Sequence, residues 1–184
     1  LYKDLETLYR DIIARNPGGS LAYVNLAGFY WQQGRNAEAI EMIRTLIAIR
    51  PDYAPAYSKL GGVYASQGRF ADAIAAYRSA LTLKPGFAEA HYHLALAHAA
   101  QGRHAEAIAE YQAALAAEPH FVGAHYELGR AHAAQGRHAE AIAEYKAALA
   151  LKPDFVKVYQ GLAATYADLG QYPEAIAALK AALA

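Results

Sequence analysis

The sequence has no cysteine among its 184 residues. This absence excludes disulfide bonds, cysteine-ligated zinc sites and thiol nucleophiles, and it leaves the redox compartment of the protein open. The chain also has no excess of either charge, because 17 Lys and Arg residues balance 17 Asp and Glu residues. Without a net basic field, binding to nucleic acid or to an anionic membrane surface is not expected.

Long hydrophobic runs are missing as well, although apolar residues make up 55% of the chain. Alanine supplies much of that fraction, and no stretch approaches the roughly 18 uninterrupted apolar residues that a membrane-spanning helix needs. We therefore expect a soluble chain that is not inserted into a membrane. Because both ends fall inside repeated or apolar segments, we expect a fragment of a longer bacterial protein, located in the cytoplasm or periplasm or tethered to a membrane.

What the sequence does contain is a repeat of 34 residues. Proline, glycine and leucine each recur at this interval in a separate series. The series are Pro17, Pro51, Pro85, Pro119 and Pro153; Gly34, Gly68, Gly102, Gly136 and Gly170; and Leu26, Leu60, Leu94, Leu128 and Leu162. Three series with the same fixed spacing indicate a repeat architecture in which each unit packs against its neighbours.

Each repeat predicts two helices joined by a tight turn. In residues 88–121, Leu94 lies one helical turn from His91 and from His98, which forms a stripe on one face. Gly102 supplies the positive φ that favours a helix stop. The proline at the end of the repeat then blocks the second helix. Helices of about 13 residues are marginal alone, so their stability must come from packing.

The pattern within one repeat resembles the tetratricopeptide repeat. The second full repeat carries it as Tyr57, Leu60-Gly61, Tyr64, Gly68, Ala73, Tyr77, Ala80 and Pro85. The resemblance implies an all-α, right-handed superhelical solenoid whose first helices line a concave face. It predicts one solenoid over 1–184: half a repeat in 1–19, full repeats in 20–53, 54–87, 88–121 and 122–155, and a nearly complete repeat in 156–184.

The eight histidines all fall in the middle two repeats. Histidine clusters can bind metal ions, but six of these residues occupy repeat positions that hold aromatic residues elsewhere. The six are His91 and His125, which replace Tyr23, Tyr57 and Tyr159; His98 and His132, which replace Tyr30, Tyr64 and Tyr166; and His104 and His138, which replace Phe70 and Tyr172. We therefore expect a packing role, with no metal and no cofactor.

A ladder of arginines marks the turn between the helices of successive repeats. Arg35, Arg69, Arg103 and Arg137 each precede an acidic residue by three positions, so we expect the ladder to be neutralised locally rather than to bind phosphate. No Ser/His/Asp grouping, recurring pair of carboxylates or glycine-rich phosphate loop is present. The chain is not expected to be an enzyme.

The resemblance places ligands of this family on the outward positions of each first helix. Here those positions hold large or charged side chains that repeat packing does not require. The candidate groove residues are Val24, Trp31, Lys59, Tyr92, Leu96, Tyr126, Glu127 and Arg130. We expect the rings of Tyr92 and Tyr126 to project from neighbouring first helices about 10 Å apart, and Arg130 to bind an acidic group of the ligand.

The leading hypothesis is therefore a scaffold that binds a protein or peptide of unknown identity in its groove. The carboxylate clamp and the asparagine ladder of two known subtypes are absent. A second hypothesis is an accessory domain of a larger enzyme, because residues 2–26 resemble the segment that follows the last membrane helix in bacterial O-mannosyltransferase-like proteins. A third is self-association through the exposed ends. The residues upstream of Leu1 would separate the first two.

Overall fold

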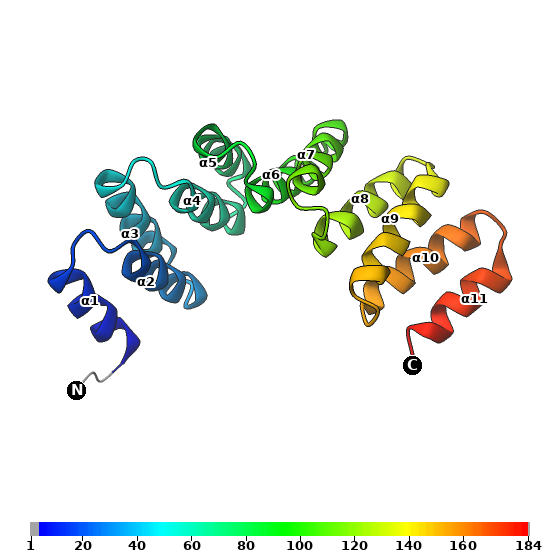
Figure 1. Ribbon diagram of the computed structural model, residues 1–184, viewed down its shortest axis with the longest axis horizontal. Coiled ribbons are helices and arrows are strands. Elements are labelled where there is room, and N and C mark those ends of the chain that lie inside the picture. The colour runs from blue at the N-terminus through cyan, green and yellow to red at the C-terminus, as the bar shows by residue number, and fades with distance from the viewer. Residues whose placement is uncertain (1–3, 184) are drawn as a thin grey trace. The chain divides into compact units, whose positions relative to one another are not determined.

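The computed structural model describes residues 4–183, and this range forms eleven helices and no strand. The chain divides into two compact units, Leu1–Gln101 and Gly102–Ala184. The first unit holds α1 (Leu5–Arg15), α2 (Ser20–Gln32), α3 (Asn36–Ile49), α4 (Ala54–Ser66), α5 (Phe70–Leu83) and α6 (Ala88–Ala100). The second holds α7 (His104–Ala117), α8 (Val122–Ala134), α9 (His138–Leu151), α10 (Val156–Asp168) and α11 (Tyr172–Ala181). Within each unit, consecutive helices form antiparallel pairs (Figure 1).

The predicted helix stops are confirmed. All five turn glycines adopt a positive φ between 71° and 74°, a region that residues with a β-carbon rarely enter. At the first of these turns, the N–H of Gly34 donates to the carbonyl of Trp31 (2.9 Å) and the N–H of Arg35 donates to the carbonyl of Tyr30 (2.9 Å). These bonds satisfy carbonyl groups that the helix end would otherwise leave without partners. The last helix was expected over 173–184; α11 ends at Ala181, and Ala184 lies outside the described residues.

The two helices of a repeat approach closely where the first helix carries a glycine. A β-carbon built on Gly61 would lie 2.6 Å from Cε1 of Tyr77, and one built on Gly129 would lie 2.8 Å from Cδ1 of Tyr145. Both tyrosines are almost completely buried. Small residues in the first helix thus let the two helices of a repeat approach closely, and the aromatic rings fill the remaining space.

Histidine and tyrosine are interchangeable at one position of the first helices. In four repeats, the side chain at this position makes a hydrogen bond to the carbonyl oxygen of the proline six residues earlier. The pairs are Tyr57 with Pro51 (3.1 Å), His91 with Pro85 (2.9 Å), His125 with Pro119 (3.0 Å) and Tyr159 with Pro153 (3.0 Å). Because the ring and its bond are retained, the packing role expected for His91 and His125 is confirmed.

The second expected histidine position is buried. His98 and His132 are 1% and 5% exposed, like Tyr30 and Tyr64 at the same position. The Nδ1 atom of His132 has no hydrogen-bond partner among the described residues. Burial lowers the pKa of His132 below its ordinary value of 6.5, and the nearby positive charge of Arg137 lowers it further. His132 is therefore neutral at pH 7.

The arginine ladder is neutralised in three repeats of four. Arg35, Arg69 and Arg103 donate to Glu38, Asp72 and Glu106. In two of these repeats the guanidinium also stacks over a tyrosine, with Arg35 4.2 Å from the Tyr30 ring and Arg69 4.3 Å from the Tyr64 ring. Arg137 differs, because it donates to Oε1 of Gln135 (2.6 Å), and the expectation that Glu140 neutralises it is wrong.

The first helix, α1, has no fully buried residue and is attached to α2 by a polar cluster around Glu6. Its Oε1 accepts from the hydroxyl of Tyr30 (2.8 Å) and from Nε of Arg10 (3.1 Å), and its Oε2 accepts from Nη1 of Arg35 (2.8 Å). These bonds, led by that from Arg35, lower the pKa of Glu6 to about 2. The carboxylate is therefore ionised at neutral pH and fixes α1 beside α2.

We expect His98→Tyr and His132→Tyr to preserve or raise the free energy of unfolding at neutral pH, since ring volume is kept and less polar surface is buried. In an earlier repeat, Arg44 donates to the hydroxyl of Tyr64 (3.1 Å). Gln112 and His132 hold the same two repeat positions. A tyrosine at position 132 would therefore have the side-chain amide of Gln112 as the corresponding hydrogen-bond donor. A loss of more than about 2 kcal/mol in urea denaturation would contradict the packing role.

His132→Tyr should also change how the free energy of unfolding depends on pH. Because the folded-state pKa of His132 is below 6.5, the unfolded chain binds more protons than the folded chain once the pH falls below that value. The stability that neutral His132 contributes to the folded state is complete above pH 6.5 and declines below it. His132→Tyr should therefore lose less stability than the parent chain between about pH 7 and pH 5.

Candidate functional site

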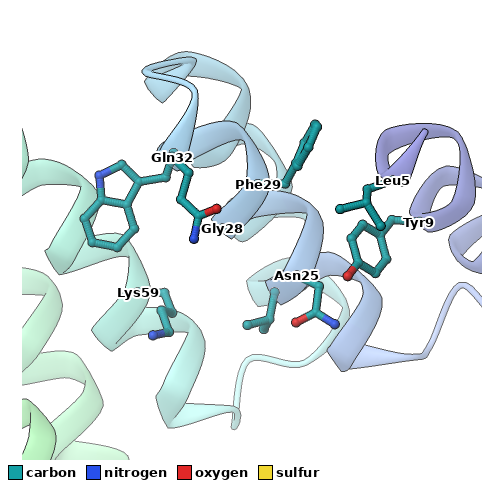
Figure 2. A pocket seen from close by; sticks show the side chains of 9 residues that line it. Leu5, Tyr9, Asn25, Gly28, Phe29, Gln32 and Lys59 are labelled. Carbon is teal, nitrogen blue, oxygen red and sulfur yellow. The ribbon is translucent and has the colours of Figure 1, made fainter.

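A cavity of about 580 Å³ lies in the first unit between α1, α2 and α4. We call it the α2 groove. Leu5 and Tyr9 of α1 and Lys59 of α4 line it, and α2 contributes Val24, Asn25, Gly28, Phe29, Trp31 and Gln32. Figure 2 shows Leu5 and Tyr9 on the α1 side and Lys59 on the α4 side, with Asn25 and Gln32 between them. Three predicted groove residues, Val24, Trp31 and Lys59, are therefore brought together in one cavity.

Trp31 is fixed in place by α4. Its Nε1 donates to the hydroxyl oxygen of Ser66 (3.0 Å), and Ser66 in turn donates to the carbonyl of Val63 (2.8 Å). The far edge of the indole lies over Gly62, where a built β-carbon would be 3.0 Å from Cη2. The ring is thus held in one orientation before any ligand arrives, and a rigid aromatic side chain loses little entropy on binding.

Polar groups stand beside this aromatic surface. The Lys59 amine lies 3.8 Å from Oε1 of Glu89, and the two side chains are 45% and 47% exposed. An exposed ion pair at this distance is weak, so a ligand carboxylate can compete with Glu89 for the amine. The amides of Asn25 and Gln32 add donors and acceptors to the same cavity. The α2 groove therefore combines an apolar surface with a few polar groups, as ligand sites commonly do.

The second unit has a cavity of about 470 Å³ between α8, α9 and α10, which we call the α8 groove. Tyr126 and Arg130 of α8 line it, opposite Lys157, Gln160 and Gly161 of α10, and Tyr145 of α9 contributes its ring. Arg130 donates from Nη1 to Oε2 of Glu127 (2.8 Å), with the Arg130 side chain 57% exposed and that of Glu127 17% exposed. Glu127 thus holds Arg130 rather than lining the cavity, and the exposed part of the guanidinium faces solvent.

The ring of Tyr126 takes part in helix packing, contrary to the prediction. The expectation was a ring that points away from repeat packing. Instead the ring centre lies 5.2 Å from that of Phe155 and 6.3 Å from that of Tyr145, and the residue is half-buried. This expectation was wrong because Phe155, from the turn before α10, folds back against α8. Removing the Tyr126 ring would therefore cost packing as well as groove surface.

Tyr92 and Leu96 lie on α6 and are half-buried. The Tyr92 ring meets the His93 ring edge to face, with centres 5.2 Å apart. Neither residue lines the α2 groove. Tyr92 belongs to the first unit and Tyr126 to the second, so their joint contact with one peptide stays a prediction.

Two tyrosines were missed as groove residues. Tyr9 lines the α2 groove and Tyr145 lines the α8 groove, and neither is among the predicted groove residues. They are four repeats apart and share one repeat position with Tyr77 and Tyr111. A ring at this position extends past its own helix pair toward the next first helix. Burial raises the pKa of Tyr145 to about 12, so its hydroxyl remains a neutral hydrogen-bond donor.

Gly161 explains why the Tyr145 ring reaches the α8 groove. A β-carbon built on Gly161 would lie 2.7 Å from Cζ and 2.9 Å from the hydroxyl oxygen of Tyr145. The missing side chain leaves the end of the ring at the floor of the groove. The 34-residue register, which pairs Tyr145 with Gly161 and Tyr9 with Asn25, is the sequence signal that could have found this arrangement.

Two other kinds of site were searched for among residues 4–183. No three His, Asp or Glu side chains in that range gather closely enough to hold a metal ion. Across the same range, every helix is too short or too polar to cross a membrane.

Comparison with protein families shows which repeat this is. Tetratricopeptide repeat models match residues 20–85, 58–120, 98–143 and 157–184, and a further TPR repeat model matches residues 129–170. Together these matches run from residue 20 to residue 184. The chain is therefore built of tetratricopeptide repeats.

Solved structures with the same arrangement of helices support this assignment. A crystal structure of MamA is 28% identical, covers 86% of this chain and 92% of its own, and superimposes with a TM-score of 0.78. MamA from Desulfovibrio magneticus RS-1, residues 41 to the end, is 19% identical with a TM-score of 0.77, covering 100% of this chain and 96% of its own. YrrB, described as a TPR protein with an unusual peptide-binding site, is 19% identical with a TM-score of 0.73, covering 95% and 90%.

These likenesses confirm the predicted fold class, an all-α solenoid of tetratricopeptide helix pairs. No curated protein matches the sequence. The expected origin in a membrane O-mannosyltransferase-like protein receives no support from the families and structures that match.

Alanine substitutions at Gly28 and Gly161, two glycines inside first helices, should have opposite effects on stability. Gly28→Ala should raise the free energy of unfolding by about 0.5–1 kcal/mol, because it lies inside α2 and its added β-carbon meets nothing within 4 Å. Gly161→Ala has the same helical advantage, but its β-carbon collides with a buried ring that Gly129 already confines from the other side. Overpacking costs about 1–3 kcal/mol, so we expect a net loss in urea denaturation. Equal effects of the two substitutions would contradict the proposed close approach.

Proposed function

We propose that this chain is a protein-interaction module that holds a peptide or an extended segment of a partner protein, and that the α2 groove is its principal binding site. The observation that carries the proposal is the fixed indole of Trp31, supported by Ser66 and Gly62. Rigid aromatic side chains with neighbouring polar groups are typical anchors of peptide recognition.

The groove indicates the chemistry of the ligand. Tyr9, Phe29 and Trp31 offer a surface for an apolar or aromatic side chain. Lys59, which is held only weakly by Glu89, offers a charge for an acidic side chain or a terminal carboxylate. We therefore propose a peptide with an apolar anchor and an acidic group, bound with micromolar affinity, as expected for a modest groove contact.

The α8 groove is proposed as a further contact surface. Tyr126, Glu127 and Arg130 combine an aromatic ring with a partly exposed guanidinium, which again suits an apolar residue beside an acidic one. Tyr92 and Leu96 on α6 complete the set proposed from the sequence. The peptide-binding site described for YrrB lies on the same fold, but at 19% identity that likeness concerns the fold alone. The proposal rests on the groove residues of this chain.

The α2 groove contains its own reporter, because Trp31 is the single tryptophan of the chain. We would select peptides from a random library displayed on phage against the immobilised parent chain, with no subtraction against any variant. A peptide that enters the groove should change the Trp31 emission in a saturable titration. With a fluorescently labelled peptide, Trp31→Ala should weaken binding by about thirtyfold or more, corresponding to the ~2 kcal/mol of an aromatic anchor.

Lys59→Glu should weaken the same peptide about tenfold, and raising the salt concentration should reduce the difference. Lys146→Glu provides the matched control, since Lys146 is exposed and lines neither groove. If selected peptides bind Trp31→Ala and the parent chain equally, while circular dichroism shows both to be folded, the α2 groove is not the binding site.

A further inference from the structure

One carboxylate oxygen connects the α2 groove to α6. Oε1 of Glu89 lies 3.8 Å from the Lys59 amine and 3.9 Å from Nε2 of His93. Lys59 lines the α2 groove from the α4 side (Figure 2), whereas Glu89 and His93 line neither groove. A ligand that binds Lys59 therefore changes the electrostatic surroundings of two side chains on α6.

The imidazole of His93 is positioned by aromatic rings and remains open to solvent. It stacks on the ring of Tyr77 of α5, with ring centres 5.9 Å apart and planes inclined by 16°, and it meets the Tyr92 ring edge to face. The His93 side chain is 39% exposed, so it can exchange a proton with water. The same repeat position holds Asn25, Lys59, Glu127 and Gly161. The repeat therefore accepts other residue types at this position.

The groups that face His93 keep its imidazole neutral at pH 7. Partial burial of the ring lowers the pKa of His93 below 6.5; the charge of Glu89 on α6 raises it, and the charge of Lys59 on α4 lowers it. The hydroxyl of Tyr77, which faces the ring from α5, is neutral too, because burial raises its pKa to about 12. In the first unit, the charge next to the imidazole thus comes from one ammonium and one carboxylate, which balance each other.

A ligand carboxylate would disturb this balance. An exposed ion pair such as that of Lys59 with Glu89 is weak, so the ligand can compete for the amine. It also brings a second negative charge to a cluster that has one positive charge, and a negative charge near an imidazole favours the protonated form. We propose that an acidic ligand group binds Lys59 in competition with Glu89, and that His93 takes up a proton from solvent when it binds. This proton uptake presupposes the proposed function of the α2 groove, which it makes dependent on pH.

Linkage sets the direction of the pH dependence. Because the bound chain holds the His93 proton more firmly than the free chain, affinity for a carboxylate should rise as the pH falls. It should level off once His93 is protonated in the free chain as well. A rise of about 0.5–1 pH unit in the midpoint of the His93 titration corresponds to about three- to tenfold tighter binding at pH 5 than at pH 7.5.

The probe for a test is N-acetyl-L-phenylalanine, which carries one aromatic ring and one carboxylate that stays ionised above pH 5. Its neutral amide, N-acetyl-L-phenylalaninamide, is the matched control. Binding to the 184-residue chain would be followed at constant ionic strength by Trp31 emission and by the NMR signals of the histidine rings. The carboxylate should bind about three- to tenfold more tightly at pH 5 than at pH 7.5 and raise the His93 midpoint. The amide should show neither effect.

Two substitutions separate the steps of the proposal. His93→Asn, which installs the residue found at position 25, should remove the pH dependence and leave binding at pH 7.5 within about twofold, because His93 is neutral there. Glu89→Gln removes the competing carboxylate and should tighten binding of the probe at pH 7.5 about threefold or more. Glu118→Gln is the matched control, since Glu118 is exposed and lines neither groove. Circular dichroism checks that each variant is folded.

The outcomes distinguish this proposal from the groove function on which it rests. Saturable binding with equal affinity at the two pH values, or with an unchanged His93 midpoint in the parent chain, would overturn the proton uptake and leave the groove function standing. A pH dependence that persists in folded His93→Asn would also overturn it. If about 50 mM probe leaves Trp31 emission unchanged at both pH values, the groove function and the proton uptake both fail.

Discussion

The ring of Tyr145 lies between two first helices at points where neither carries a side chain. Gly129 of α8 and Gly161 of α10 both approach it so closely that an added β-carbon would be within 3 Å of the ring. Short helices such as these are marginal alone and gain stability from burying large side chains against their neighbours. Because both facing residues are glycines, the backbones of α8 and α10 come close to the Tyr145 ring on its two sides. Tyr77, which lies over Gly61, shows the same contact in the first unit.

This contact also shapes the candidate sites. Where the next first helix offers glycine, as at Gly161, the end of the tyrosine ring becomes part of the groove floor. Where it offers a large side chain, the ring is covered: His93 stacks on Tyr77 with ring centres 5.9 Å apart and planes inclined by 16°. The residue at this one position of the next first helix therefore decides what meets the tyrosine ring, a glycine backbone or a second ring, while both tyrosines stay almost completely buried. Binding surfaces can thus vary from repeat to repeat while the helix packing stays the same.

The fold could be predicted because its signals are local. Glycine with positive φ and proline after each second helix end the helices at fixed intervals, and the first helices begin at Ser20, Ala54, Ala88, Val122 and Val156, the residues from which the repeats were counted. The groove could be predicted in part: Val24, Trp31 and Lys59 meet in one cavity. What could not be predicted depended on particular side-chain contacts. Tyr126 packs on Phe155, Arg137 bonds to Gln135, and Glu6 joins α1 to Arg35, none of which follows from periodicity.

The central claim is that a helix inside a unit is stabilised by the helices on both of its sides. Native-state hydrogen exchange tests it directly, because α11 and α3 carry the same repeat positions but only α3 is covered on both faces. The account predicts that, in the monomer, the amides of residues 176–180 exchange at least about tenfold faster than those of residues 40–44, since local opening follows local packing. Equal protection of the two segments in a monomer would contradict it.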